Sequence, residues 1–179
     1  MLRECVEIVR SMWTNEETTY DGKHYKMVRG NCDPKPLQKP HPPIWIGGGG
    51  EQLTLRVVAR YADYSNFGGT PQEFAHKIEV LKGHCLAVGR DESEIQKTWS
   101  PDVFIRRTEK ELKAEGSRSL RGDSFENWQS ANLVGTVEQV SEKVQNYIDL
   151  GCSGFIPWCA DFPSTESVEL FAEVMNNFR

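Results

Sequence analysis

The feature that most constrains the fold is a succession of strand, loop and helix that recurs along residues 44–178. Short apolar runs end in glycine or polar loops, and each loop leads into a segment with helical spacing of apolar residues. The four predicted strands are Ile44–Ile46, Asp63–Phe67, Asp102–Ile105 and Gly154–Trp158. Because strands that alternate with helices over short connections favour parallel pairing, we expect an α/β fold with a parallel sheet packed against helices.

Local start and stop signals support the predicted helices. Capping boxes, in which a threonine and an acidic or amide side chain stand three residues apart, occur at 70–73, 108–111 and 136–139. Pro71 occupies a first helical position, and Gly89 and Gly151 stand where two helices should end. We also expect helices over 51–61 and near 164–178.

The first 43 residues follow a different pattern. Residues 2–13 have the apolar spacing of an amphipathic helix, and residues 18–28 are two β-prone runs around Asp21-Gly22, a dipeptide typical of a tight hairpin turn. Five prolines in residues 34–43 then impose an extended, irregular segment. We therefore divide the chain into an N-terminal helix and hairpin, residues 1–33, and an α/β unit, residues 34–179.

The length limits how much of a barrel the α/β unit can form. A complete eight-stranded α/β barrel needs about 250 residues, and this chain has 179, of which the first 43 precede the first predicted strand. The sequence therefore predicts a partial TIM-barrel-like fold, a half barrel of about four parallel βα units. Half a barrel leaves strand edges uncovered. We expect a homodimer, a partner chain or the N-terminal segment to cover them, and of these we favour the homodimer.

Composition excludes several classes of partner. With 26 acidic and 21 basic side chains the net charge is -5, and no basic stripe is present for binding nucleic acid. No apolar run is long enough for a membrane span, and the N-terminus lacks a signal-peptide core. None of the five cysteines has the spacing of a zinc or redox pair. We expect a cytoplasmic protein without a metal site.

The most specific local signal is Gly47-Gly-Gly-Gly50, placed between a predicted strand and a predicted helix. Unpaired N–H groups and the helix dipole favour anions at such a point, and glycines allow a phosphate to approach the backbone closely. The alternative is a tight strand-to-helix turn without a ligand. The loop is not a dinucleotide-binding fingerprint, because Gln52 occupies the position of the third glycine.

The most specific motif of the chain is the stretch from Pro34 to Gly48, PKPLQKPHPPIWIGG, followed by ARYADYSN at residues 59–66. It resembles the luciferase-like flavin and deazaflavin oxidoreductases. Four weaker motifs fit the same family pattern: Met12-Trp-Thr14, Tyr20-Asp-Gly-Lys-His-Tyr25, Gly89-Arg-Asp91 and Val134-Gly-Thr136. The resemblance extends over nearly the whole chain.

This resemblance implies an α/β barrel that binds reduced FMN or coenzyme F-420 at the C-terminal ends of its strands. It implies hydride transfer or monooxygenation of a small organic substrate, with the cofactor phosphate at Gly47, Gly48, Gly49 and Gly50. The matching part is the second half of a family barrel, and the strands that hold most groups around the flavin ring are absent. A second hypothesis is therefore a non-catalytic half barrel that oligomerises and keeps a weak anion or flavin site.

Three further side chains follow predicted strands, where barrel loops build sites. Asn66 could hydrogen-bond a ring or phosphate, or cap its loop. Arg106 could neutralise a phosphate or carboxylate, or be solvated. Trp158 could stack on a flat ring, or belong to the barrel core. No residue is singled out as catalytic, because no histidine, cysteine or serine stands in a nucleophile or acid–base pattern.

Overall fold

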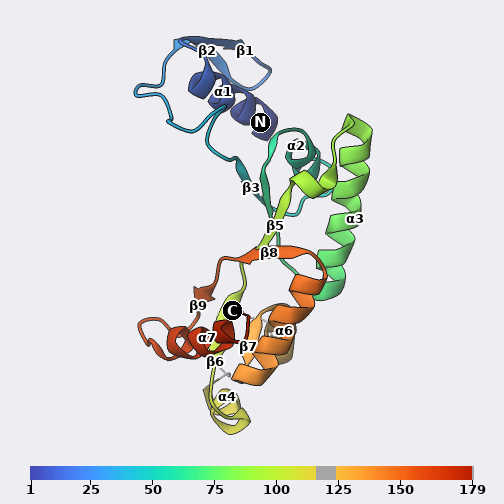
Figure 1. The fold of residues 1–179 in the computed structure, drawn as a ribbon, viewed down its shortest axis with the longest axis vertical. Coiled ribbons are helices and arrows are strands. Elements are labelled where there is room, and N and C mark those ends of the chain that lie inside the picture. The colour runs from blue at the N-terminus through green and yellow to red at the C-terminus, as the bar shows by residue number, and fades with distance from the viewer. Residues whose placement is uncertain (116–123, 179) are drawn as a thin grey trace.

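The computed structural model describes residues 1–115 and 124–178. The molecule is elongated, with helix α1 (Leu2–Thr14) and the hairpin β1 (Thr18–Asp21) and β2 (Lys26–Gly30) at one end (Figure 1). Helix α4 (Glu109–Glu115) lies at the opposite end. The predicted N-terminal helix and hairpin are thus both present.

Seven further strands form two open sheets in which every pairing is parallel. The first sheet has the order β3 (Trp45–Gly47), β4 (Tyr64–Asn66), β5 (Gln96–Trp99), β8 (Cys152–Phe155). The second has the order β7 (Leu133–Gly135), β6 (Asp102–Ile105), β9 (Trp158–Cys159). The predicted parallel α/β class is confirmed, and within the described ranges the sheets do not close into a barrel.

Helices follow the strands as the capping signals predict. Their bounds are α2 (Thr54–Tyr61), α3 (Pro71–Val88), α5 (Phe125–Ala131), α6 (Val137–Asp149) and α7 (Glu166–Asn176), with a 3₁₀ turn at Glu92–Glu94. Thr70 and Thr136 both form complete capping boxes. Helix α3 ends at Gly89, whose left-handed φ of 69° a side chain would disfavour.

Aromatic packing joins the helices to the first sheet. Trp99 of β5 stacks on Tyr147 of α6 with ring centroids 3.7 Å apart, and Phe74 of α3 meets the same tyrosine edge-on. All three side chains are buried. The Tyr147 hydroxyl donates to the Gly69 carbonyl at 2.6 Å, so this buried polar group is satisfied. The cluster fixes α3 and α6 against the sheet that carries the glycine loop.

Two glutamates of α1 hold the hairpin against that helix, and one of them, Glu7, also joins the N-terminal segment to α2. Glu7 accepts hydrogen bonds from the hydroxyls of Tyr20 in β1 and Tyr61 in α2, both at 2.5 Å. Glu4 accepts from the backbone N–H groups of His24 and Tyr25. The hairpin is present, but the tight turn predicted at Asp21-Gly22 is not, because Asp21 is the last residue of β1 and residues 22–25 connect it to β2.

Other boundaries also differ from the sequence prediction. Helix α2 begins at Thr54, not at residue 51, because residues 51–53 form a turn. The predicted last strand is two short strands, β8 and β9. The sequence pattern does not predict β5, which lacks an apolar run, or β7, which runs directly into the Thr136 cap of α6. Helix α5 has no counterpart among the predicted helices, and residues 116–123 lie outside the described residues.

Gly83 in the interior of α3 offers a test of the helix. A Cβ added there would meet nothing within 4 Å, and its backbone is helical. Gly83→Ala should therefore raise the free energy of unfolding by about 0.5–1 kcal/mol, because alanine loses less backbone entropy in a helix. Urea unfolding measures this change. A loss of stability would show that residue 83 is not in an open helical position.

Candidate functional site

The glycine loop is positioned by the parallel pairing of β3 and β4. Gly47, the last residue of β3, stands opposite Asn66, the last residue of β4. The Gly48 N–H donates to the Asn66 carbonyl at 2.8 Å, extending the ladder by one bond. The structure thus brings together the predicted glycine loop and the predicted Asn66 at the C-terminal edge of the first sheet.

The surroundings that a side chain would meet differ among the four glycines of the loop. A Cβ on Gly47 would enter open space, and Gly48 has a φ of 117°, which side chains rarely adopt. A Cβ on Gly49 would collide with the Lys77 side chain, and one on Gly50 would approach the Thr54 hydroxyl to 2.9 Å. Only Gly47 therefore borders space that a side chain would take from a ligand.

The loop also presents backbone donors. Within residues 1–115 and 124–178, the N–H groups of residues 49–52 have no hydrogen-bond acceptor. They precede α2, whose Leu53 N-cap provides no side-chain acceptor. A run of unpaired N–H groups at the positive end of a helix dipole suits a phosphate or carboxylate. The residues present therefore fit the phosphate end of a flavin-type cofactor.

A lysine that sequence reasoning did not single out lies against this loop. Lys77 of α3 donates to the Gly49 carbonyl at 3.0 Å and pairs with Glu51 at 3.3 Å. His76 lies 3.2 Å from the same Glu51 oxygen. The hydrogen bond from Lys77 is the main cause of a lowered pKa at Glu51, ahead of His76. No sequence spacing relates Lys77 to residue 49, since the contact depends on how α3 packs.

Asn66 uses its side chain within the sheet. Its amide nitrogen donates to the hydroxyls of Thr98 at 3.0 Å and Ser100 at 3.1 Å. On the same face, Trp45 stacks on Tyr64 with ring centroids 4.1 Å apart, and 49% of Trp45 is exposed. This sheet face therefore offers an aromatic surface and bonded polar groups next to the loop.

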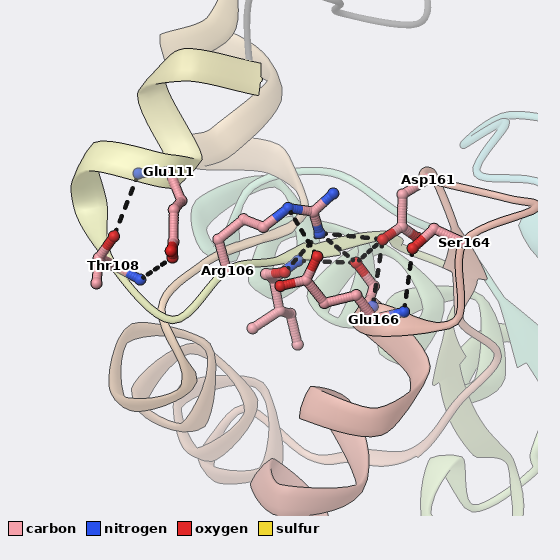
Figure 2. Close-up of polar contacts among 8 residues, drawn as sticks. Arg106, Thr108, Glu111, Asp161, Ser164 and Glu166 are labelled. Atoms are coloured by element: carbon pink, nitrogen blue, oxygen red, sulfur yellow. Dashed lines mark hydrogen bonds and ion pairs between the residues drawn. The ribbon is translucent and has the colours of Figure 1, made fainter.

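Arg106 lies at the end of β6 in a buried ionic cluster (Figure 2). Its guanidinium donates to Asp161 at 3.0 Å and to the Ile105 carbonyl at 2.7 Å, and it lies 3.5 Å from Glu166. Ser167 donates its hydroxyl to the same Asp161 oxygen at 2.8 Å. The cluster joins β6 to the loop before α7 and to the start of that helix.

The structure does not bring Arg106 or Trp158 to the glycine loop. Both belong to the second sheet, in which Trp158 of β9 pairs with Asp102 at the start of β6, while the loop follows β3 of the first sheet (Figure 1). Trp158 is 68% exposed, so it is not a core residue in this chain. Arg106 is 3% exposed and engaged by carboxylates, so its contacts here are those of a structural residue.

The Arg106 cluster should contribute to folding stability. Arg106→Met leaves Asp161 buried without its cation, which costs about 3–5 kcal/mol of the free energy of unfolding. Arg107→Met is the matched control, since that arginine pairs with Glu173 at the surface and its loss should cost less than about 1 kcal/mol. Urea unfolding compares the two variants. Equal losses would contradict a buried, strongly coupled pair at Arg106.

Two kinds of feature are absent from the described part of the chain. No group of three or more histidine, cysteine, aspartate or glutamate side chains is placed to hold a metal ion there. Over the same ranges, no helix combines the length and apolar character that crossing a bilayer requires.

The chain is similar in sequence to an uncharacterized mycobacterial protein and to a bacterial monooxygenase. An uncharacterized protein of Mycobacterium tuberculosis is 37% identical over 93 residues, which are 51% of this chain and 32% of that protein. The FMNH(2)-dependent dimethylsulfone monooxygenase of Pseudomonas putida is 23% identical over 192 aligned positions, covering 86% of this chain and 52% of the monooxygenase. The match therefore spans about half the length of the monooxygenase and about a third of the mycobacterial protein.

A solved structure shares the fold over the whole chain. An F-420-dependent secondary alcohol dehydrogenase, determined with an F-420–acetone adduct, superimposes with a TM-score of 0.83 at 14% identity. It covers 100% of this chain, which corresponds to 61% of the dehydrogenase. The sequence pattern of one family, luciferase-like monooxygenase, matches residues 1–122, more than half of the chain. The chain belongs to the luciferase-like monooxygenase family.

Proposed function

We propose that this chain is part of a flavin- or deazaflavin-dependent oxidoreductase and that its glycine loop binds the cofactor phosphate. The observation that carries the proposal is the glycine loop, in which a Cβ on Gly47 would enter open space and the N–H groups of residues 49–52 have no acceptor among the described residues. Family membership supports the same conclusion. The substrate class, a small organic molecule, follows from the family resemblance alone.

The chain's own residues would bind and orient the cofactor. Loop N–H groups would donate to phosphate oxygens, and Lys77 would supply the compensating charge on leaving Glu51. Asn66 holds the loop through its backbone carbonyl and keeps its amide on Thr98 and Ser100. The bound flavin or deazaflavin would supply hydride transfer or, for FMN, oxygen activation. We place Arg106 and Trp158 outside this phosphate site, because they belong to the other sheet.

The proposal includes FMN and F-420 as alternative cofactors. The named relative from Pseudomonas putida is FMNH(2)-dependent, and the alcohol dehydrogenase structure contains F-420. Both molecules carry a phosphate, so the glycine loop does not choose between them. Titration of the protein with each cofactor in parallel, followed by fluorescence, would make that choice.

Gly47→Val tests the site because it fills the open space without forcing a strained backbone. Gly47 lies in a strand with an ordinary φ, whereas a side chain at Gly48 would distort the loop at φ 117°. We expect the affinity for FMN or F-420 to fall at least about tenfold, a loss of about 1.4 kcal/mol, because a branched side chain excludes phosphate from the backbone.

Gly83→Val is the matched control, since a Cβ at residue 83 also meets nothing within 4 Å but lies on α3 away from the loop. It should bind the cofactor as the parent does. If Gly47→Val also binds like the parent while remaining folded, the cofactor phosphate does not occupy the loop. If the parent binds neither cofactor, the oxidoreductase proposal fails.

A second candidate function, an oligomeric half barrel without catalysis, is favoured by the open edge at β3. A hollow of about 310 Å³ lies between α1 and β3 and is lined by Gly47 and by apolar side chains that include Val6, Trp13, Ile44 and Trp45. Trp45 is half-exposed in its wall. Such an apolar edge is normally covered. We propose that this edge is covered either by a second copy of the chain in a homodimer or by a partner chain that completes the barrel.

Gel filtration with light scattering tests the homodimer. The parent chain should elute as a dimer, and Trp45→Glu should elute as a monomer, because a charge in an apolar interface is costly to desolvate. Leu86→Glu is the control, since Leu86 is 75% exposed on α3, outside the β3 edge. A parent that is monomeric at all concentrations would exclude the homodimer, leaving a partner chain as the cover.

A further inference from the structure

The outer surface of the α2–α3 pair has a hollow of about 240 Å³ that the proposed cofactor site does not include. Its lining residues are Arg56, Arg60, His84, Ala87 and Val88. A second hollow of about 500 Å³ shares Arg60, Ala87 and Val88 with it and adds Arg90. No acidic side chain lines either hollow, although the whole protein carries a net charge of -5.

Among the arginines that the structure describes, Arg56 and Arg60 differ from the others in forming no ion pair, hydrogen bond or cation–π contact. Within residues 1–115 and 124–178, every other arginine has a carboxylate or an aromatic ring beside it: Arg3 with Glu7, Arg10 with Tyr61, Arg29 with Glu17, Arg90 with Glu94, Arg106 with Asp161 and Arg107 with Glu173. Arg56 and Arg60 stand four residues apart on one exposed face of α2, where like charges repel. An anion between them would relieve that repulsion.

His84 completes the polar lining. Its Nε2 lies 2.8 Å from the Glu51 carbonyl, and because a carbonyl only accepts, Nε2 carries the proton. This bond fixes the imidazole at the wall of the hollow. The Glu51 carboxylate is engaged with His76 and Lys77 instead, so it does not neutralise the two arginines.

We propose that this hollow is a second anion site, which binds a phosphate group between Arg56 and Arg60. Guanidinium forks match phosphate oxygens with paired N–H donors, and two such forks suit a dianion better than a single carboxylate. The space holds a phosphate with several waters. The adjoining hollow, with Ala59, Ala87 and Val88 in its wall, has room for the organic part of a phosphate monoester.

This inference does not depend on Gly47. That glycine lines neither hollow, although Arg56 stands in the first turn of α2 and His84 bonds the Glu51 carbonyl next to the loop. Gly47→Val should therefore leave phosphate binding in the hollow unchanged. The parent chain and Gly47→Val, each titrated with cofactor and with phosphate, therefore distinguish a failure of the cofactor proposal from a failure of this one.

The experiment is a titration of the isotopically labelled chain with inorganic phosphate and, separately, phenyl phosphate at constant ionic strength, followed by amide NMR. The parent should show saturable shifts on α2 and α3 near Arg60 and Val88. Arg56→Gln/Arg60→Gln should weaken binding by about tenfold or more. Arg3→Gln/Arg107→Gln removes the same charge from exposed, paired arginines and should change the affinity by less than about twofold.

The possible outcomes are distinct. Tighter binding of phenyl phosphate would support a monoester as the ligand, and equal binding would support free phosphate. Non-saturable shifts in the parent, or equal losses in both double variants, would overturn the proposal, since either result indicates general charge screening. Shifts confined to the glycine loop would overturn it as well, because they would place the phosphate in the first site.

Discussion

The parallel register between β3 and β4 is the constraint on which the candidate site depends. It places Gly47 opposite Asn66 and lets the Gly48 N–H bond the Asn66 carbonyl, which sets the direction in which the loop leaves the sheet. Because the loop is directed there, the N–H groups of residues 49–52 stay unpaired and Lys77 of α3 reaches the Gly49 carbonyl. The buried stack of Trp99 on Tyr147 holds the neighbouring strand and helix in place. The register of β3 and β4, the path of the loop and the Lys77 charge therefore define the candidate site together at the C-terminal edge of the first sheet.

Sequence reasoning located this edge because its signals are local. A short apolar strand, a run of glycines and capping boxes each depend on a few adjacent residues, and the helices at Pro71 and Val137 begin where those boxes predict. What it missed depends on distant contacts. The four-residue hairpin connection depends on Glu4 of α1, and strand β5 has an unremarkable sequence but lies between β4 and β8. Lys77 contacts the Gly49 carbonyl only because α3 packs near the loop, and no local sequence pattern predicts that contact.

The two predicted cationic and aromatic candidates illustrate the same limit. Arg106 follows a strand, as a ligand-binding residue would, but the chain returns Asp161 and Glu166 to it from 55 and 60 residues away, and it becomes part of a buried ionic cluster. Trp158 was expected at the end of one strand and lies in a two-residue strand of the second sheet. Conversely, the four-residue spacing of Arg56 and Arg60 is that of an ordinary solvated helix face. Their hollow is formed by α3, which the helical pattern of α2 alone does not reveal.

The most direct test of the central claim is amide NMR of the labelled chain with FMN and with riboflavin, which has the same ring but no phosphate. The account predicts saturable shifts of the Gly47, Gly49 and Gly50 amides with FMN and much smaller shifts there with riboflavin, because loop N–H groups bind the phosphate. Equal shifts with both ligands, or FMN shifts that leave the loop amides unmoved, would contradict it.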